Sequence, residues 1–239
     1  MSCILVSPTL SCQTILLSSS AWYREGAFDL DQKSWLDARG SNHATLSGSG
    51  LTELRKKGHG AFGEVAALQG TTLSKINFGP VIKDEFTICS VTRYTGGTMG
   101  RILQGAEKNW LHGHHSYHGL DKAGVAYYES WKTDMLENVQ PVTNWVVMCG
   151  TNAASQLKLV NGVDVGTDTG GSGGVTLQVN QGSKADQKSN FAIVEVVVWD
   201  RGLTNEEMYE ASGYLMEKLH IPPSPVSERV VAIVFPCYC

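Results

Sequence analysis

One nine-residue run near the C-terminus constrains the fold more than any other part of the chain. Residues Phe191–Trp199 read FAIVEVVVW, with Glu195 as the only polar side chain. Alternate side chains of a strand point to opposite faces, so this run has apolar groups on both faces. The even positions from Ala192 to Val198 form one uninterrupted apolar face, and we expect Val196 on it to point into the core. The run therefore predicts a central strand covered on both sides.

Shorter runs of β-forming residues recur between about residues 20 and 220, separated by glycine-rich turns. The pair Asn161-Gly162 stands between two of them, and it predicts a tight hairpin because type I′ turns need positive φ at both central residues. The expected strands, by length and β-propensity, are Leu73–Phe78, Phe86–Arg93, Val125–Tyr128, Trp145–Met148, Gln156–Val160 and Gly174–Val179.

A single helix is expected after the central strand. Thr204 and Glu207 have the spacing of a capping box, and apolar residues from Met208 to Leu219 keep a helical period. The consecutive prolines that follow, beginning at Pro222, predict where the helix must already have ended.

Composition excludes several classes of protein. The chain has 239 residues, a net charge of −4, and only 18% charged residues. It has no basic stripe that could neutralise phosphates, which argues against a nucleic-acid partner. No apolar stretch approaches the roughly 18 residues of a membrane span. The expected organisation is an apolar leader at 1–19, one β domain at 20–220 and a tail at 221–239.

The two ends raise separate questions. The leader resembles a cleaved secretory signal in its apolar residues, but no Lys or Arg precedes Arg24. The tail contains the strand-length apolar run Val230–Phe235, and we expect it to be covered by the domain or by a partner chain.

Cys89 and Cys149 lie in apolar stretches and are expected to be buried free thiols, with a disulfide between them as the alternative. The cysteines do not indicate a cellular compartment.

Three stretches stand out in chain order: residues 34–45, residues 109–113 with 124–131, and residues 194–207, which lead into the helix. Together they resemble the laminin-G-like, concanavalin A-like jelly-roll superfamily. The resemblance implies an all-β fold, namely a two-sheet antiparallel jelly-roll sandwich with one short C-terminal helix. It also implies a concave face and end loops that in this superfamily often bind sugars or Ca²⁺, although the fold by itself does not fix a function.

An enzyme of the retaining glycanase type is not expected. Such enzymes need two carboxylates roughly 5 Å apart, and two residues on one strand face need even spacing. Asp84 and Glu85 are adjacent and point to opposite faces, while Glu195 stands alone among valines. The sequence also has no nucleophile elbow and no phosphate loop.

The segment from Asn109 to Trp131 is the best candidate for a binding site. It combines aromatic rings, on which the apolar faces of sugars dock, with groups that can bond hydroxyls, although core packing is the simpler role for most of these aromatics. We expect its histidines to lie in an exposed loop; on a strand, His112 and His114 would share one face. The candidate ligand-binding residues are Asn109, Trp110, His112, His114, Tyr117 and Trp131.

Two further expectations concern metal and function. Asp164 and Asp168, beside a glycine-rich loop, could contribute oxygens to a calcium site. The leading hypothesis is a non-catalytic, lectin-like recognition domain that binds a glycan or a glycoprotein surface, extracellular or on the surface of a cell or particle. The alternative is a structural or assembly subunit that uses its faces and tails for contacts with protein partners.

Overall fold

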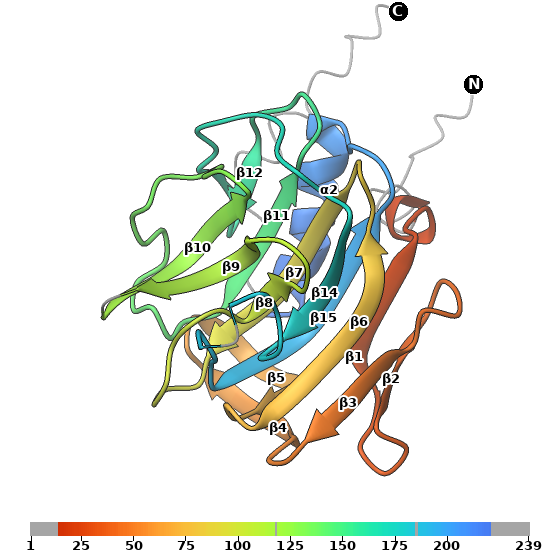
Figure 1. Cartoon of the computed structure of the whole chain (residues 1–239), viewed down its shortest axis with the longest axis vertical. Helices are drawn as coiled ribbons and strands as arrows, with labels where there is room; N and C mark the ends of the chain where they lie inside the picture. Colours follow the sequence, from red (N-terminus) through yellow and green to blue (C-terminus); the bar gives the residue numbers. More distant parts are fainter. Residues whose placement is uncertain (1–13, 118, 185, 221–239) are drawn as a thin grey trace, which may run out of the picture.

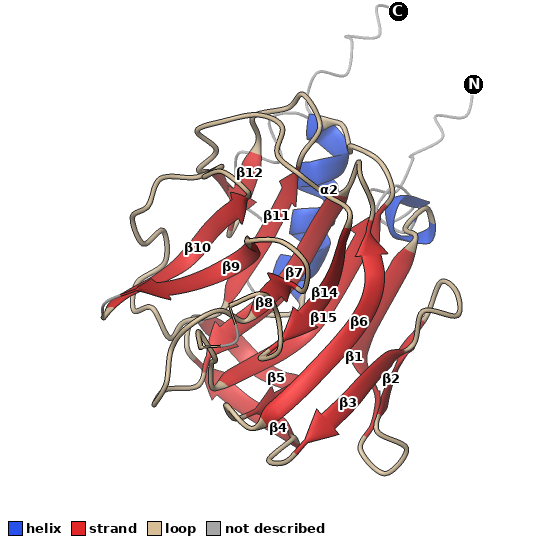
Figure 2. Ribbon diagram, in the orientation of Figure 1, coloured by secondary structure: helices blue, strands red, loops and turns tan. Residues whose placement is uncertain are grey.

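The computed structural model describes residues 14–117, 119–184 and 186–220 (Figure 1). The run Val230–Phe235, the prolines from Pro222 onward and most of the expected leader lie outside these ranges. Within them the regular structure is almost entirely antiparallel β, with a helical turn at residues 14–17 and one longer helix (Figure 2). The expected domain boundaries stay predictions.

Strand β15 (Phe191–Trp199) lies at the centre of the fold, and all nine of its residues are buried. One edge pairs along its length with β7 (Thr87–Tyr94). The other edge is shared, because β5 (Ala61–Gly70) pairs with its first residues and β1 (Ala21–Asp29) with its last.

Fifteen strands among the described residues belong to one hydrogen-bonded sheet that folds into two layers; thirteen follow a single path, and β5 and β4 (Thr52–Gly58) branch from it at β15. β1 joins the layers: its first residues pair with β15, and its last residues pair with β2 after a register shift. The back layer contains β15, β7, β5, β4, β11 (Val146–Thr151), β12 (Lys158–Val160) and β13 (Val163–Asp164). The front layer contains β2 (Ser34–Asp37), β3 (Ala44–Gly48), β6 (Ser74–Ile82), β14 (Val175–Val179), β8 (Leu103–Gly105), β9 (Trp110–Tyr117) and β10 (Leu120–Tyr128).

Two cores hold this arrangement together. The first fills the space between the layers and is built around large rings such as Trp35, Phe78 and Phe86. The second lies on the outer face of the back layer, under α2 (Asn205–Glu217) and the helical turn. Ile15 packs into it, and its carbonyl accepts a hydrogen bond from Trp199 Nε1 at 3.0 Å. The predicted sandwich with one short C-terminal helix is confirmed.

The central strand departs from simple alternation. A register shift against β7 falls between Ile193 and Glu195, which is a β-bulge. Val194 therefore faces the core under α2, whereas Val196 and Val198 face the core between the layers. The prediction that Val196 points inward is confirmed, but the single even-numbered face is wrong because the bulge exchanges the two faces.

The local turn and cap signals are confirmed. Asn161 and Gly162 both have positive φ, 48° and 80°, and join β12 to β13 as a two-residue hairpin. Thr204 accepts a hydrogen bond from the backbone of Glu207, whose carboxylate accepts one from the backbone of Thr204. The described helices include none with the length and apolar character that a membrane crossing needs.

Cys89 and Cys149 form a disulfide, so the expectation of free thiols is wrong. They lie directly opposite each other on β7 and β11, with Cα atoms 4.1 Å apart. Neighbouring antiparallel strands bring directly opposed side chains within reach of a bond, so the disulfide that the sequence left as the alternative is the one that forms.

We expect Val196→Asp to abolish stable folding, because it places an unpaired charge between the layers. The cost is several kcal/mol against a total stability of about 5–15 kcal/mol. The matched control is Val163→Asp, at a position 64% exposed on β13, which should unfold like the parent protein. Urea unfolding followed by circular dichroism compares the three, and a cooperatively folded Val196→Asp protein would contradict this placement.

Candidate functional site

The segment expected to be a histidine-rich loop is strand β9, so that expectation is wrong. β9 pairs along its length with β10, and a bulge at Gly124 keeps both strands in register with the core. Gly113 and Gly124 have φ of 93° and 82°, a conformation that glycine adopts without strain. These two glycines allow the paired strands to bend.

Three of the candidate ligand-binding residues point into the core between the layers. Trp110, His112 and His114 have no exposed surface, and they share one face of β9, as alternation requires. Trp110 stacks on Tyr128 with ring centroids 5.0 Å apart. These three side chains cannot meet a ligand at the surface, so their predicted role in binding is corrected to a role in packing.

His112 is buried because the core supplies partners for both ring nitrogens. Nδ1 lies 2.9 Å from the Tyr128 hydroxyl, and Nε2 lies 3.2 Å from the Met148 carbonyl oxygen. Burial lowers the pKa of His112 to about 4. Burial, together with the nearby His112, lowers the pKa of His114 to about 3. Both imidazoles are therefore neutral at pH 7.

The opposite face of β9 and β10 displays aromatic rings at the surface. Trp131, on the turn after β10, folds back beside Tyr127 and is half-buried. Its ring meets Tyr127 edge to face at 5.2 Å and His115 at 5.5 Å between centroids. These contacts hold the indole in one orientation while part of it faces solvent.

Arg101 fixes the polar groups beside these rings. Its Nη1 donates to Asn109 Oδ1 at 2.8 Å, and its Nε donates to Gln187 Oε1 at 2.7 Å. Burial lowers the pKa of Arg101 to about 10, so the guanidinium stays charged at neutral pH. We call the set His115, Tyr127, Trp131, Asn109 and Arg101 the Trp131 surface.

Hydrogen-bonding capacity is left over on this surface. Within the described part of the chain, Asn109 Nδ2, the Tyr127 hydroxyl and Trp131 Nε1 make no hydrogen bond, so a ligand can use them. Two of the predicted site residues contribute to this surface, Asn109 through its contact with Arg101 and Trp131 through its contacts with Tyr127 and His115. Tyr117 is the last residue of β9, and its side chain lies outside the described atoms.

Sequence reasoning missed Arg101 altogether. Its position depends on Gln187, which lies 86 residues away along the chain, and no local pattern signals such a contact. Alternation along β10 could have shown that Tyr127 faces away from Tyr128, but only once β9 was known to be a strand.

Asp164 and Asp168, the two residues proposed as calcium ligands, make other interactions in the structure. Asp168 forms an ion pair with the buried Lys132 at 2.7 Å, and Asp164 Oδ1 accepts hydrogen bonds from the backbone of Lys158 and Gly166. The described residues contain no group of three or more His, Cys, Asp or Glu side chains arranged to hold a metal ion. A calcium site at Asp164 and Asp168 therefore finds no support.

Glu195 is a structural carboxylate. It accepts hydrogen bonds from Trp22 Nε1 and the Tyr214 hydroxyl, and Lys218 Nζ lies 3.5 Å away. Burial raises its pKa, which the nearby Lys218 partly offsets. Glu195 faces α2 on the outer side of the back layer, remote from the front-layer surface that displays Trp131.

The buried histidines should make stability depend on pH. Their pKa values are lower in the folded state than in the unfolded chain, so their contribution is complete above about pH 6.5 and is lost as the pH falls toward 4. Each should cost about 2 kcal/mol at pH 5 relative to pH 7. The His114 ring packs edge to face on Tyr94, with ring centroids 4.5 Å apart. His114→Phe keeps a ring in this place but cannot titrate, so its urea-unfolding free energy should fall less over this range. Equal losses in parent and variant would contradict the assignment.

The sequence matches no protein-family model and no curated protein. Among solved structures, it is similar to domain 4 of an extracellular arabinanase from Geobacillus stearothermophilus, solved with arabinotriose. The TM-score is 0.54 at 17% identity, over 82% of this chain and 98% of that domain.

Two further similarities are weaker. A Trypanosoma rangeli sialidase variant gives a TM-score of 0.48 at 10% identity, over 89% of this chain and 38% of that one. The binding domain of botulinum neurotoxin DC, solved with SialylT, gives 0.47 at 12% identity, over 86% and 52%. The chain thus spans about a third to a half of the length of these two proteins. The fold is a β-rich one shared with the arabinanase domain, and membership of the laminin-G-like superfamily stays a prediction.

Proposed function

We propose that this chain is a non-catalytic carbohydrate-binding domain and that the glycan docks on the Trp131 surface. The observation that carries this proposal is the half-buried Trp131 ring, which meets Tyr127 and His115 edge to face and whose Nε1, like the Tyr127 hydroxyl, is a donor that no described residue uses.

The chemistry of the surface suits a sugar. The C–H face of a pyranose or furanose ring packs on an indole, while amide and phenol groups bond its hydroxyls. Arg101 already holds the oxygen of Asn109, which leaves the amide nitrogen as a donor in a fixed place. Such preorganisation reduces the entropy lost when a ligand binds.

The structural comparison supports the proposal indirectly. The arabinanase domain has the same fold over almost its whole length and was solved with a bound arabinotriose. A shared fold does not transfer a ligand, because sites are built separately on common folds. The surface residues of this chain therefore remain the main argument.

The positions of the carboxylates favour binding without catalysis. Glu195 is enclosed by its partners under α2, and Glu207 is bound by the helix cap and by Arg201. Glu85 accepts a hydrogen bond from the backbone of Gly202. Each of these three carboxylates therefore has a structural partner.

Trp131→Ala should weaken glycan binding by about 1–3 kcal/mol, the scale of one lost aromatic contact, and leave folding intact. The matched control is Tyr209→Ala, an aromatic 44% exposed on α2, on the other side of the molecule. A glycan array identifies a ligand for the parent, and calorimetry with that ligand compares the variants. Equal affinities for parent and Trp131→Ala would move the site elsewhere.

The same array separates the competing classes of function. Binding that persists in a chelator, with the glycan recovered intact, supports the proposal. Cleavage of the bound glycan would overturn the non-catalytic part of it. No binding to any glycan, together with stable co-purifying protein partners, would favour an assembly subunit instead.

A further inference from the structure

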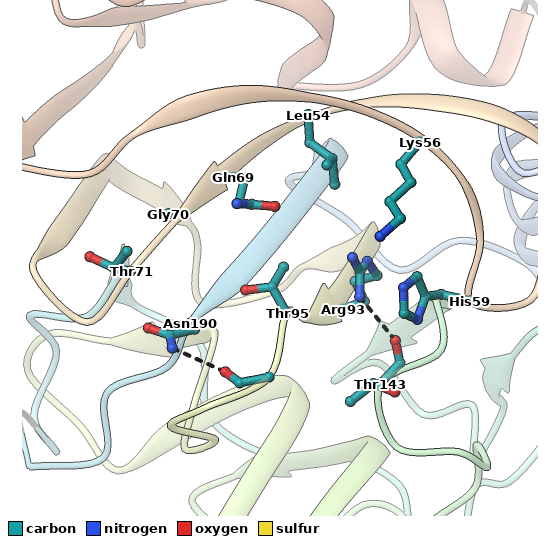
Figure 3. Close-up of a pocket in the computed structure, with 11 residues that line it drawn as sticks. Leu54, Lys56, His59, Gln69, Gly70, Thr71, Arg93, Thr95, Thr143 and Asn190 are labelled. Atoms are coloured by element: carbon teal, nitrogen blue, oxygen red, sulfur yellow. Dashed lines mark hydrogen bonds between the residues drawn. The ribbon is translucent and has the colours of Figure 1, made fainter.

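A hollow of about 470 Å³ opens on the outer face of the back layer. Figure 3 shows the side chains that line it. Its walls come from the β4–β5 hairpin, the end of β7, the loop before β11 and the residue that precedes β15. The lining residues that matter below are Lys56, His59, Gln69, Arg93, Thr95 and Thr143.

Strand register explains why these side chains meet. Ala192 of β15 pairs with Gln69 on one side and with Arg93 on the other, so the three side chains share one face of the sheet. Ala192 belongs to the core under α2, which identifies this face as the outer one. Ala192 lies between its two larger neighbours on this face, and both of these neighbours, Gln69 and Arg93, line the hollow.

Arg93 is buried there without a counter-charge. It is 5% exposed, and its guanidinium lies 5.2 Å from the Trp145 ring centroid. Nη1 donates to the carbonyl oxygens of Tyr94 and Thr143, at 2.8 Å and 3.3 Å. Nε has no partner among the described residues, and none of their carboxylates forms an ion pair with Arg93. A buried cation of this kind is costly unless an anion pairs with it.

Two more basic groups face the same space. Lys56 and His59 converge beside Arg93 (Figure 3). Burial lowers the pKa of His59, and the charges of Arg93 and Lys56 lower it further. Among the described residues that line the hollow there is no Asp or Glu. The positive potential is therefore not neutralised locally.

Neutral hydrogen-bonding groups complete the lining. Within the described structure, the Gln69 amide and the Thr95 hydroxyl make no hydrogen bond, so both are available to a ligand. Asn190, by contrast, is fixed in the wall, since it donates to the Gly96 carbonyl and accepts from the backbone of Thr72.

We propose that this hollow binds an acidic monosaccharide unit, with its carboxylate or sulfate held by Arg93 and Lys56. A guanidinium and an ammonium in an otherwise acid-free site suit an oxyanion. The volume lies in the range of small-ligand pockets and exceeds what one inorganic anion fills, which leaves room for a sugar ring beside Gln69 and Thr95. This site is separate from the Trp131 surface and does not depend on it.

Calorimetric titrations at constant ionic strength test the proposal. The probes are glucuronate, glucose 6-sulfate, inorganic sulfate and neutral glucose. The two acidic sugars should bind about tenfold or more tightly than either glucose or inorganic sulfate. Failure of both acidic sugars to bind would overturn the proposal. Equally tight binding of inorganic sulfate would overturn its sugar part and identify a site for a free anion.

Matched variants locate the binding. Lys56→Gln should weaken acidic-sugar binding several-fold, whereas Lys57→Gln makes the same charge change on the other face of β4 and should have no effect. Equal losses in both variants would indicate general electrostatic attraction and contradict the site. Arg93→Gln should abolish binding of the acidic sugar. If that variant fails to fold, the comparison of Lys56→Gln with Lys57→Gln still tests whether the sugar binds in the hollow. Trp131→Ala should leave binding of the acidic sugar unchanged. This result distinguishes binding in the hollow from binding on the Trp131 surface.

Discussion

The complete burial of β15 determines most of the architecture around it. A strand with apolar groups on both faces must have a packed layer on each side. The front layer covers one side, and α2 with the helical turn at residues 14–17 covers the other. Glu195 is the only polar side chain in the strand. Trp22 and Tyr214 donate hydrogen bonds to its carboxylate, and Lys218 forms an ion pair with it.

Local signals were enough to predict the elements whose determinants are close in sequence. The apolar run of β15, the turn at Asn161-Gly162 and the capping box at Thr204 depend on neighbouring residues, and the structure confirms them. The bulge in β15 was not predictable, because it depends on how β7 pairs with the strand. The pairing of Cys89 with Cys149 likewise depends on the register of two strands that lie far apart in the chain.

The sequence predicted only part of the candidate site, because contacts between distant parts of the chain decide which side chains reach the surface. The segment from Asn109 to Trp131 was chosen for its aromatic and polar residues, and the structure divides them between two faces. His112 is tolerated in the core only because Tyr128 and Met148 supply its partners. Arg101 and Arg93 could not be recognised from the sequence as candidate site residues, because the role of each depends on residues that lie far from it along the chain. The fold thus places a mainly aromatic surface on the front layer and a basic hollow on the back layer.

The disulfide has a consequence for how the front layer is attached. Cys89 and Cys149 are 60 residues apart, and the chain between them contains β8, β9, β10 and Trp131. This stretch is a covalently closed ring, which remains closed when its strands separate, so its unfolded conformations are fewer. A protease that cuts once inside the ring would leave both fragments joined through the sulfur bridge. The aromatic surface would then stay tethered to the back layer after such a nick.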